Sequence, residues 1–451
     1  MFKNVKELEH RTTMFPSNME KTATYLFLFT IFILPLHTQL IYIVLPHYTG
    51  LPSELASMWK EMIFLIVTMI LVSNFLISHG RIRISFLDTL VLLFFVLLLV
   101  YVIASKKDTV ASLYGFRIFT EPLMVYFIAR TIRVDYPIIK TFLGYFFYLG
   151  VAISIWAIFQ TAVLGGKFLI DLGYKSEYGR LGGSLYISHH LFQRAIGTFS
   201  SPNTFGIYLQ STIMLGVYFY YIQTELKRIN YYLYMFILMF GMIYSFSRSA
   251  WTALFISLLS FFALRTDVKK VAGVVLKALL ISFVLIAIAG LISPTIVESL
   301  LAHVANTISL RDPSAVGHIA SLSSSFQFIL SNPFGVGLGM SGPRASLRTG
   351  TSLNTESSYF LLAFDIGILG AVLYLGIIFT MIIYLFSSIK RTEDSDIKLF
   401  KIIVLATLIG QIFSWNFLPY IVELETTIIL FFLLGLALNT GTQSVPSVQY
   451  G

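Results

Sequence analysis

Long apolar runs, separated by short polar or charged segments, recur along the whole chain. A helix of about twenty apolar residues is long enough to cross the hydrocarbon core of a bilayer. The runs do not show the strict alternation of a membrane β-strand. They lie at Ala23–Leu45, Met62–Ile77, Phe86–Ile103, Phe116–Thr131, Ile138–Leu164, Thr204–Ile222, Tyr231–Phe246, Ala250–Leu264, Val271–Ile292, Ser357–Phe386, Leu399–Trp415 and Tyr420–Leu438. The pattern predicts an all-α, polytopic transmembrane bundle of about twelve spans, with residues 1–451 forming a single integral membrane domain.

Charge interrupts the apolar pattern at two places, and the span count depends on both. The fourth expected span contains Arg117 and Glu121, which at i, i+4 spacing can pair on one helix face. An ionisable pair inside a span indicates a functional site, although a structural ion pair has the same pattern. The seventh and eighth expected spans are divided only by Ser247-Arg248-Ser249.

Composition agrees with a membrane protein. Hydrophobic residues make up 57% of the chain and charged residues 12%, whereas about a quarter of a soluble domain is charged. The chain has no cysteine, which excludes disulfides and thiolate metal sites. The net charge of +9 indicates membrane orientation and contact with lipid rather than binding of nucleic acid.

The distribution of Lys and Arg predicts the orientation. With the N-terminus in the cytoplasm, the inner loops receive most of the 31 basic residues, as the positive-inside rule requires. Both termini are then cytoplasmic, and the polar tail at 439–451 is expected to be disordered. Two long loops, 165–203 and 293–356, face the outside. Loops of that length without a function are uncommon.

The second outer loop contains an expected amphipathic helix. Apolar residues recur at helical spacing within Ser314–Leu330, and Asn332-Pro333 ends the pattern. Gly335-Val336-Gly337-Leu338-Gly339 comes next. Because it follows no strand of a nucleotide-binding unit, we expect a tight turn there rather than a dinucleotide site.

Arginines gather in the outer loops, where membrane insertion does not require them. A guanidinium presents a planar fork of donors that matches phosphate oxygens, so several together suit a diphosphate. The alternatives are solvated loop charges and, in the tight hairpin, an interfacial side chain that snorkels. The diphosphate-binding candidates are Arg194, Arg248, Arg311, Arg344 and Arg348, and the secondary candidates are Arg117, Arg180 and His318.

Four motifs follow one another between about Arg194 and Gly370. They are Gly197-Thr198-Phe199 with Pro202-Asn203; Ser247-Arg248-Ser249-Ala250-Trp251; Asn332-Pro333-Phe334-Gly335-Val336-Gly337-Leu338-Gly339; and Glu356-Ser357-Ser358-Tyr359 with Gly367 and Gly370. In this order and placement they resemble the O-antigen ligase and O-antigen polymerase family of membrane glycosyltransferases. Asn203, at the start of a span, is also expected to cap that helix.

The resemblance implies a substrate and a reaction. The substrate is a glycan on a polyprenyl diphosphate carrier at the outer face of a bacterial cytoplasmic membrane. The reaction transfers that glycan to an acceptor hydroxyl without a nucleotide sugar, a metal or a cofactor. Fixed arginines stabilise the charge that grows on a diphosphate leaving group. The expected partners, besides membrane lipid, are a flippase and a chain-length regulator.

The chain departs from the family pattern at two positions. The ligases usually open the last motif with His, whereas this chain has Glu356, which favours a polymerase that joins one lipid-linked repeat unit to another. Glu356 is the candidate general base, with Arg248 as the second catalytic candidate. A carboxylate at that point can instead cap the helix or position an arginine. His318 stands where family members often have Arg.

Two other functions stay open. A ligase would move finished glycan to a terminal lipid, wall polymer or protein. A polysaccharide transporter or flippase would also suit about twelve spans. Transporters place polar breaks near mid-bilayer in corresponding halves, whereas here the polar groups gather in outer loops of the second half and no inverted repeat is visible. That difference favours surface chemistry on a membrane-bound substrate.

Overall fold

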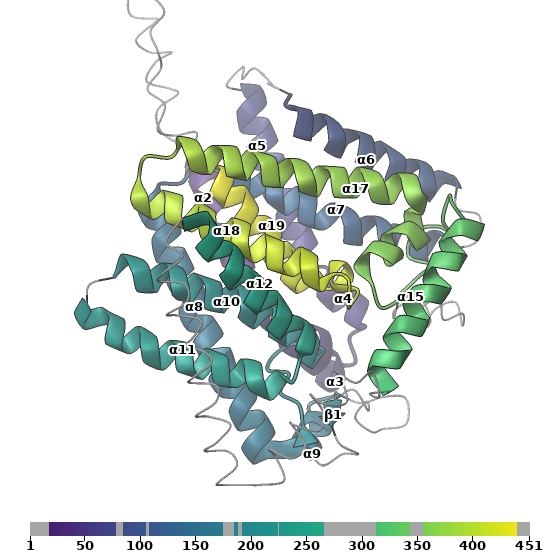
Figure 1. The fold of residues 1–451 in the computed structure, drawn as a ribbon. Helices are drawn as coiled ribbons and strands as arrows, with labels where there is room; N and C mark the ends of the chain where they lie inside the picture. The colour runs from purple at the N-terminus through teal and green to yellow at the C-terminus, as the bar shows by residue number, and fades with distance from the viewer. Residues whose placement is uncertain are drawn as a thin grey trace, which may run out of the picture.

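The computed structural model describes residues 18–77, 84–104, 108–174, 185–187, 192–223, 225–265, 313–342 and 355–439. Throughout these ranges the chain is a bundle of helices (Figure 1), which confirms the all-α class. The described strands are two short ones, β1 (Tyr186–Ile187) and β2 (Phe192–Gln193), paired antiparallel in the first long loop.

The helices follow the apolar runs closely. The first half comprises α2 (Asn18–Ile33), η1 (Leu34–Leu36), η2 (Thr38–Val44), α3 (Leu45–Thr49), α4 (Ser53–Ser57), α5 (Trp59–Ile77), α6 (Phe86–Ala104), α7 (Thr109–Thr131), α8 (Tyr136–Phe159), η3 (Gln160–Leu164) and α9 (Gly165–Asp171). The second half comprises α10 (Pro202–Ile222), α11 (Glu225–Ser245), α12 (Arg248–Arg265), α15 (Pro313–Ser331), α17 (Ser358–Arg391), α18 (Ser395–Ser414), η5 (Tyr420–Val422) and α19 (Leu424–Asn439).

The chain is a multi-pass membrane protein. Seven of the described helical segments are long and apolar enough to cross a membrane, and α19 is a shorter apolar helix. The expected span at 271–292 lies outside the described residues. Twelve spans, and the orientation of both termini, therefore stay predictions. The expected amphipathic helix at 314–330 coincides with α15, which stands at one edge of the bundle beside α17 (Figure 1).

Small residues let the central helices approach closely. A Cβ on Gly435 of α19 would lie 2.5 Å from the carbonyl oxygen of Tyr126 on α7. The side chain of Asn439 then donates to the carbonyls of Ala129 (3.0 Å) and Ile132 (2.7 Å) at the end of α7. In a lipid environment, where tails are as apolar as the helices, such close backbone packing holds helices together. α7 and α19 therefore pack closely against each other within the bundle.

Candidate functional site at converging helix ends

The connection between α18 and α19, residues 415–423, joins the N-terminal ends of three other helices. The hydroxyl of Tyr420 lies 2.6 Å from that of Ser249, in the first turn of α12. Thr204 of α10 donates to Glu423 (3.2 Å), and Ser358 of α17 donates to the carbonyl of Leu418 (2.8 Å). The N-termini of α10, α12, α17 and α19 thus meet at one place. Each carries a partial positive charge, so the place favours anions.

Arg194 connects the loop before α10 to the turn between α11 and α12. Its Nε donates to the carbonyl of Ser245 (2.9 Å), and one Nη donates to the carbonyl of Phe246 (3.3 Å) and to the side-chain oxygen of Asn203 (2.9 Å). Bonds from a charged donor are stronger than neutral ones. Arg194 is therefore fixed in position, with an architectural role beside any contact with substrate.

Asn203 does not cap α10 as the sequence suggested. The N-cap is Ser201, whose side chain accepts from the backbone N–H of Thr204. Because Pro202 is the first helical residue, the cap falls one position before it. This leaves the Asn203 amide oxygen to hold Arg194.

The turn between α11 and α12 presents Arg248 at the first position of a helix. Phe246 has a φ of 46°, a conformation that costs free energy for a bulky side chain. Trp251 closes the hairpin by donating from its indole N–H to the carbonyl of Met242 (2.9 Å). Arg248 is partly buried there, and its guanidinium adds to the charge of the helix end.

The two arginines are close enough to affect one another. Burial lowers the pKa of Arg194 to about 10, the Tyr420 hydroxyl acts in the opposite direction, and the positive charge of Arg248 lowers it further. Arg194 is still protonated at neutral pH. Two like charges held together at four helix ends bind best to a group with more than one negative charge.

Glu356 lies directly before a segment that is anchored to α18. The Ser357 hydroxyl donates to the carbonyl of Trp415 (3.3 Å), and the Tyr359 hydroxyl donates to that of Ile412 (2.6 Å). Glu356 itself is partly buried. The same 415–423 connection therefore positions both Glu356 and, through Tyr420, the start of α12 that carries Arg248.

The glycine-rich segment docks into a break in α17. Gly367 has φ 68° and ψ 176°, which interrupts the helix. Backbone bonds then form from Val336 N–H to the Phe364 carbonyl (2.7 Å) and from Ile368 N–H to the Pro333 carbonyl (2.9 Å). The expected tight turn is thus confirmed. It lets the glycine-rich segment pack into the break of α17 at Gly367.

Asp365 holds this docked segment from inside α17. Its carboxylate, 3% exposed, accepts from the backbone N–H of Gly339 (2.9 Å) and from the hydroxyl of Ser341 (2.5 Å). An acidic residue within an apolar span is costly unless it has such partners. The fixed segment leads directly to residues 343–354, which include Arg344 and Arg348.

A second group of charges lies between α5 and α7. Arg117 pairs with Glu121 at 3.5 Å, which confirms the expected i, i+4 pair. Lys60 joins it through Glu121 (2.9 Å), and Glu61 pairs with both Lys60 and Arg117. The four charges balance, which supports the structural alternative for this pair.

The described residues bring Arg194, Arg248 and Glu356 to one end of the bundle, and Arg117 to the separate group on α7. Arg180, Arg311, Arg344 and Arg348 lie outside the described residues, and so does the side chain of His318, although its backbone is in α15. Over the described ranges, no three His, Asp or Glu side chains gather as a metal site.

Sequence reasoning did not find Tyr420, Glu423 or Asp365. Asp365 gave a signal, because it is an acidic residue in an apolar run. Tyr420 and Glu423 gave a weaker one, since both stand near the outer end of the last expected span. Their partners are distant in sequence, so only the fold identifies them.

Comparison with known proteins bears on residues at this site. Residues 233–375 match the model of a family described as O-antigen ligase. This range includes the Arg248 turn, the glycine-rich segment, Glu356 and Asp365. The chain is also similar to an O-antigen polymerase of Salmonella muenchen, with 23% identity over 272 residues, covering 59% of this chain and 67% of the relative.

Proposed function

We propose that this chain, which contains an O-antigen ligase family domain and is a distant homologue of an O-antigen polymerase, is itself a glycan polymerase. Its donor is an oligosaccharide on a polyprenyl diphosphate carrier, and its acceptor is a sugar hydroxyl of another lipid-linked repeat unit. The reaction takes place at the outer face of the bacterial cytoplasmic membrane. A flippase acts before this reaction, and a chain-length regulator acts beside the polymerase.

The reaction is a displacement at the anomeric carbon of the donor. The acceptor oxygen forms a bond to that carbon, and the bond from the carbon to the diphosphate oxygen breaks. Glu356 takes the acceptor proton as general base. The polyprenyl diphosphate leaves with the electron pair of the broken bond. Negative charge therefore grows on the diphosphate during the step.

The arrangement of Arg194 and Arg248 carries this proposal. Two guanidiniums and four converging helix N-termini place positive charge at this end of the bundle, beside the carboxylate of Glu423. Preorganised positive charge stabilises a growing negative charge without having to reorganise. Arg311, Arg344 and Arg348 are proposed to complete the diphosphate site. Because arginines supply the positive charge, the proposed reaction needs no divalent metal.

Two observations favour a polymerase over a ligase. Glu356 stands where the resembling ligases usually have His, and the curated relative is described as an O-antigen polymerase. The matched family's own description, O-antigen ligase, supports the ligase as the second candidate. The two differ only in the acceptor: another lipid-linked repeat unit for a polymerase, and a terminal acceptor for a ligase.

The test uses purified full-length protein with polyprenyl-diphosphate-linked repeat units and no nucleotide sugar. We expect glycan ladders with the wild type in the presence of EDTA. Removing a fixed donor to the growing charge costs about a hundredfold or more in rate, so Arg248→Ala should lose the ladder. Removing a general base costs roughly a hundredfold to ten-thousandfold, so Glu356→Gln should lose it as well. Thr131→Ala, at an exposed helix end, is the matched control and should keep it.

Three different results would contradict three different parts of the proposal. Full activity in both variants would remove the site assignment. Loss in EDTA that added metal restores would refute the metal-free reaction. Transfer of preassembled glycan to a terminal acceptor, with no growth of repeat units, would identify a ligase.

A further inference from the structure

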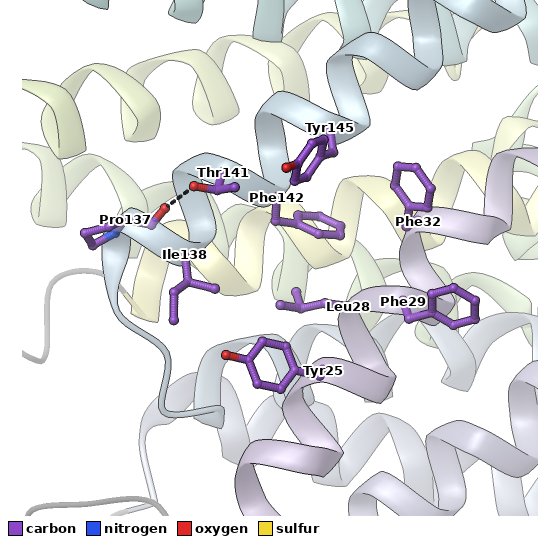
Figure 2. A pocket seen from close by; sticks show the side chains of 9 residues that line it. All are labelled: Tyr25, Leu28, Phe29, Phe32, Pro137, Ile138, Thr141, Phe142 and Tyr145. Atoms are coloured by element: carbon purple, nitrogen blue, oxygen red, sulfur yellow. Dashed lines mark hydrogen bonds between the residues drawn. The ribbon is translucent and has the colours of Figure 1, made fainter.

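An apolar groove of about 610 Å³ lies between α2 and α8. Figure 2 shows side chains of the two helices facing each other across it. Leu28 and Phe142 are buried at its base, whereas Tyr25, Phe29 and Tyr145 are more than half exposed at its rim. The volume is typical of a ligand site, and the rim is open at the outer surface of the bundle.

The groove has a solid floor. Phe432 of α19 lies 5.5 Å from Phe142 and 5.7 Å from Phe27, measured between ring centres. The one threonine of the lining, Thr141, donates its hydroxyl to the carbonyl of Pro137 (2.9 Å). Its polar group is therefore already satisfied, and the groove offers carbon surface, much of it aromatic.

Both walls of the groove lead to the polar site. On the α2 side, the Pro35 carbonyl accepts a bond from Thr198, and the Gln39 N–H donates to the Thr198 carbonyl (3.0 Å). On the α8 side, Gln160 donates to the carbonyl of Gly197 (3.3 Å). Thr198 and Gly197 belong to the short loop that also carries Arg194.

We propose that this groove binds part of the isoprenoid chain of the polyprenyl diphosphate carrier. The proposal rests on the proposed function, because it takes the diphosphate to be held at Arg194 and Arg248. A chain attached to that diphosphate has to descend along the outside of the bundle, and α2 and α8 run from the polar loop to the groove.

The distance from the polar loop to the groove distinguishes a polyprenyl chain from the acyl chain of an ordinary lipid. At about 1.5 Å per residue, Tyr25 lies roughly 15 Å along the helix from Pro35, and Tyr145 roughly 22 Å from Gln160. Half of a hydrocarbon core is only about 15 Å deep. A polyprenyl chain is longer than one leaflet is deep, so it can reach both walls of the groove. An acyl chain from the same leaflet can reach the α2 wall but ends before the α8 wall at Tyr145. The methyl branches of isoprene also pack well against aromatic rings.

Photolabelling tests the occupant directly and does not need activity. The full-length protein in nanodiscs is exposed to a long-chain polyprenyl diphosphate with a diazirine at the end of its chain. A diacyl phosphatidylglycerol with a terminal diazirine is the comparison probe. We expect the polyprenyl probe to label peptides containing residues 25–32 and 137–145, and unlabelled polyprenyl phosphate to abolish that labelling. Equal labelling by the phospholipid probe, without competition, would overturn the proposal.

A groove-filling variant gives the second readout. Thr141→Trp adds an indole within the groove, and Ile155→Trp, on the exposed face of the same helix, is its control. Losing about ten carbon contacts predicts a rise of roughly tenfold in KM for the long-chain carrier, with kcat unchanged. A carrier with a short prenyl chain should react equally with both variants and the wild type. Unchanged KM in Thr141→Trp would contradict the groove, whereas no elongation by the wild type would contradict the proposed function instead.

Discussion

Replacing Tyr420 with Phe removes one oxygen atom from the contact between the α18–α19 connection and the first turn of α12. That oxygen lies 2.6 Å from the Ser249 hydroxyl, and Tyr420 is 3% exposed. A buried hydrogen bond contributes about 0.5–1.5 kcal/mol net. Ser249 keeps a neighbour, the Ser247 hydroxyl at 3.3 Å, so we expect a loss of stability of about 1 kcal/mol.

The same substitution should affect transfer, because Ser249 adjoins Arg248. If the hydrogen bond between Tyr420 and Ser249 positions the start of α12 for the diphosphate, removing it raises the transition-state free energy by the full contribution of that bond. About 1 kcal/mol then corresponds to roughly a fivefold fall in kcat/KM. The measurement is the initial rate of chain elongation at limiting donor, together with the thermal unfolding midpoint in detergent.

Tyr136→Phe is the matched control. Its hydroxyl lies 2.7 Å from that of Tyr218, in a contact between the start of α8 and the end of α10, at the opposite end of α10 from the site. It should lose similar stability and keep its kcat/KM. An equal fall in kcat/KM in both variants would show that general loosening of the bundle, and not Arg248 positioning, explains the effect. Full activity in Tyr420→Phe would refute the positioning argument outright.

Three further predictions test other parts of the structure. Lys60→Met leaves Glu121, which is 2% exposed, without its closest cation, so the free energy of unfolding should fall by about 3–5 kcal/mol. Adding Glu121→Gln should recover part of this loss. A Lys60→Met variant as stable as the wild type in thermal unfolding would contradict the prediction. Gly339 has a φ of 69°, and a Cβ there would clash with the backbone of α7, so Gly339→Ala should reduce both stability and elongation. Gly376→Ala is the control, because a Cβ there meets nothing within 4 Å, and it should change neither. Equal effects of the two substitutions would show that the docked segment tolerates movement. Because the chain has no cysteine, a single Arg180→Cys in the first expected outer loop should react with a membrane-impermeant thiol reagent in cells whose inner membrane is intact. Labelling only after that membrane is permeabilised would invert the orientation.

The sequence predicted the local structure well. Apolar periodicity placed the helix at 314–330, and the structure has it at Pro313–Ser331. The spacing of Arg117 and Glu121 predicted an ion pair that the structure contains. Both predictions rest on helical geometry within one segment, and that geometry follows from hydrophobic spacing alone.

The sequence could not predict partners that only the fold brings together. Lys60 lies just outside the expected span Met62–Ile77, yet it is buried against Glu121 on another helix. Tyr420 and Ser249 are 171 residues apart in the chain. Asn203 shows a subtler limit, because its position at the start of a helix predicted a cap, while the neighbouring Ser201 takes that role. Each of these contacts depends on how helices pack, which periodicity does not encode.

The most direct test of the central claim is the stoichiometry of carrier release. Purified protein is given only polyprenyl-diphosphate-linked repeat units, and both new glycosidic bonds and free polyprenyl diphosphate are counted by mass spectrometry. The proposed displacement predicts one released carrier for each new bond, with Arg248→Ala releasing none above background. Chain growth that leaves the diphosphate carrier attached to every repeat unit, or the absence of any new glycosidic bond, would contradict it.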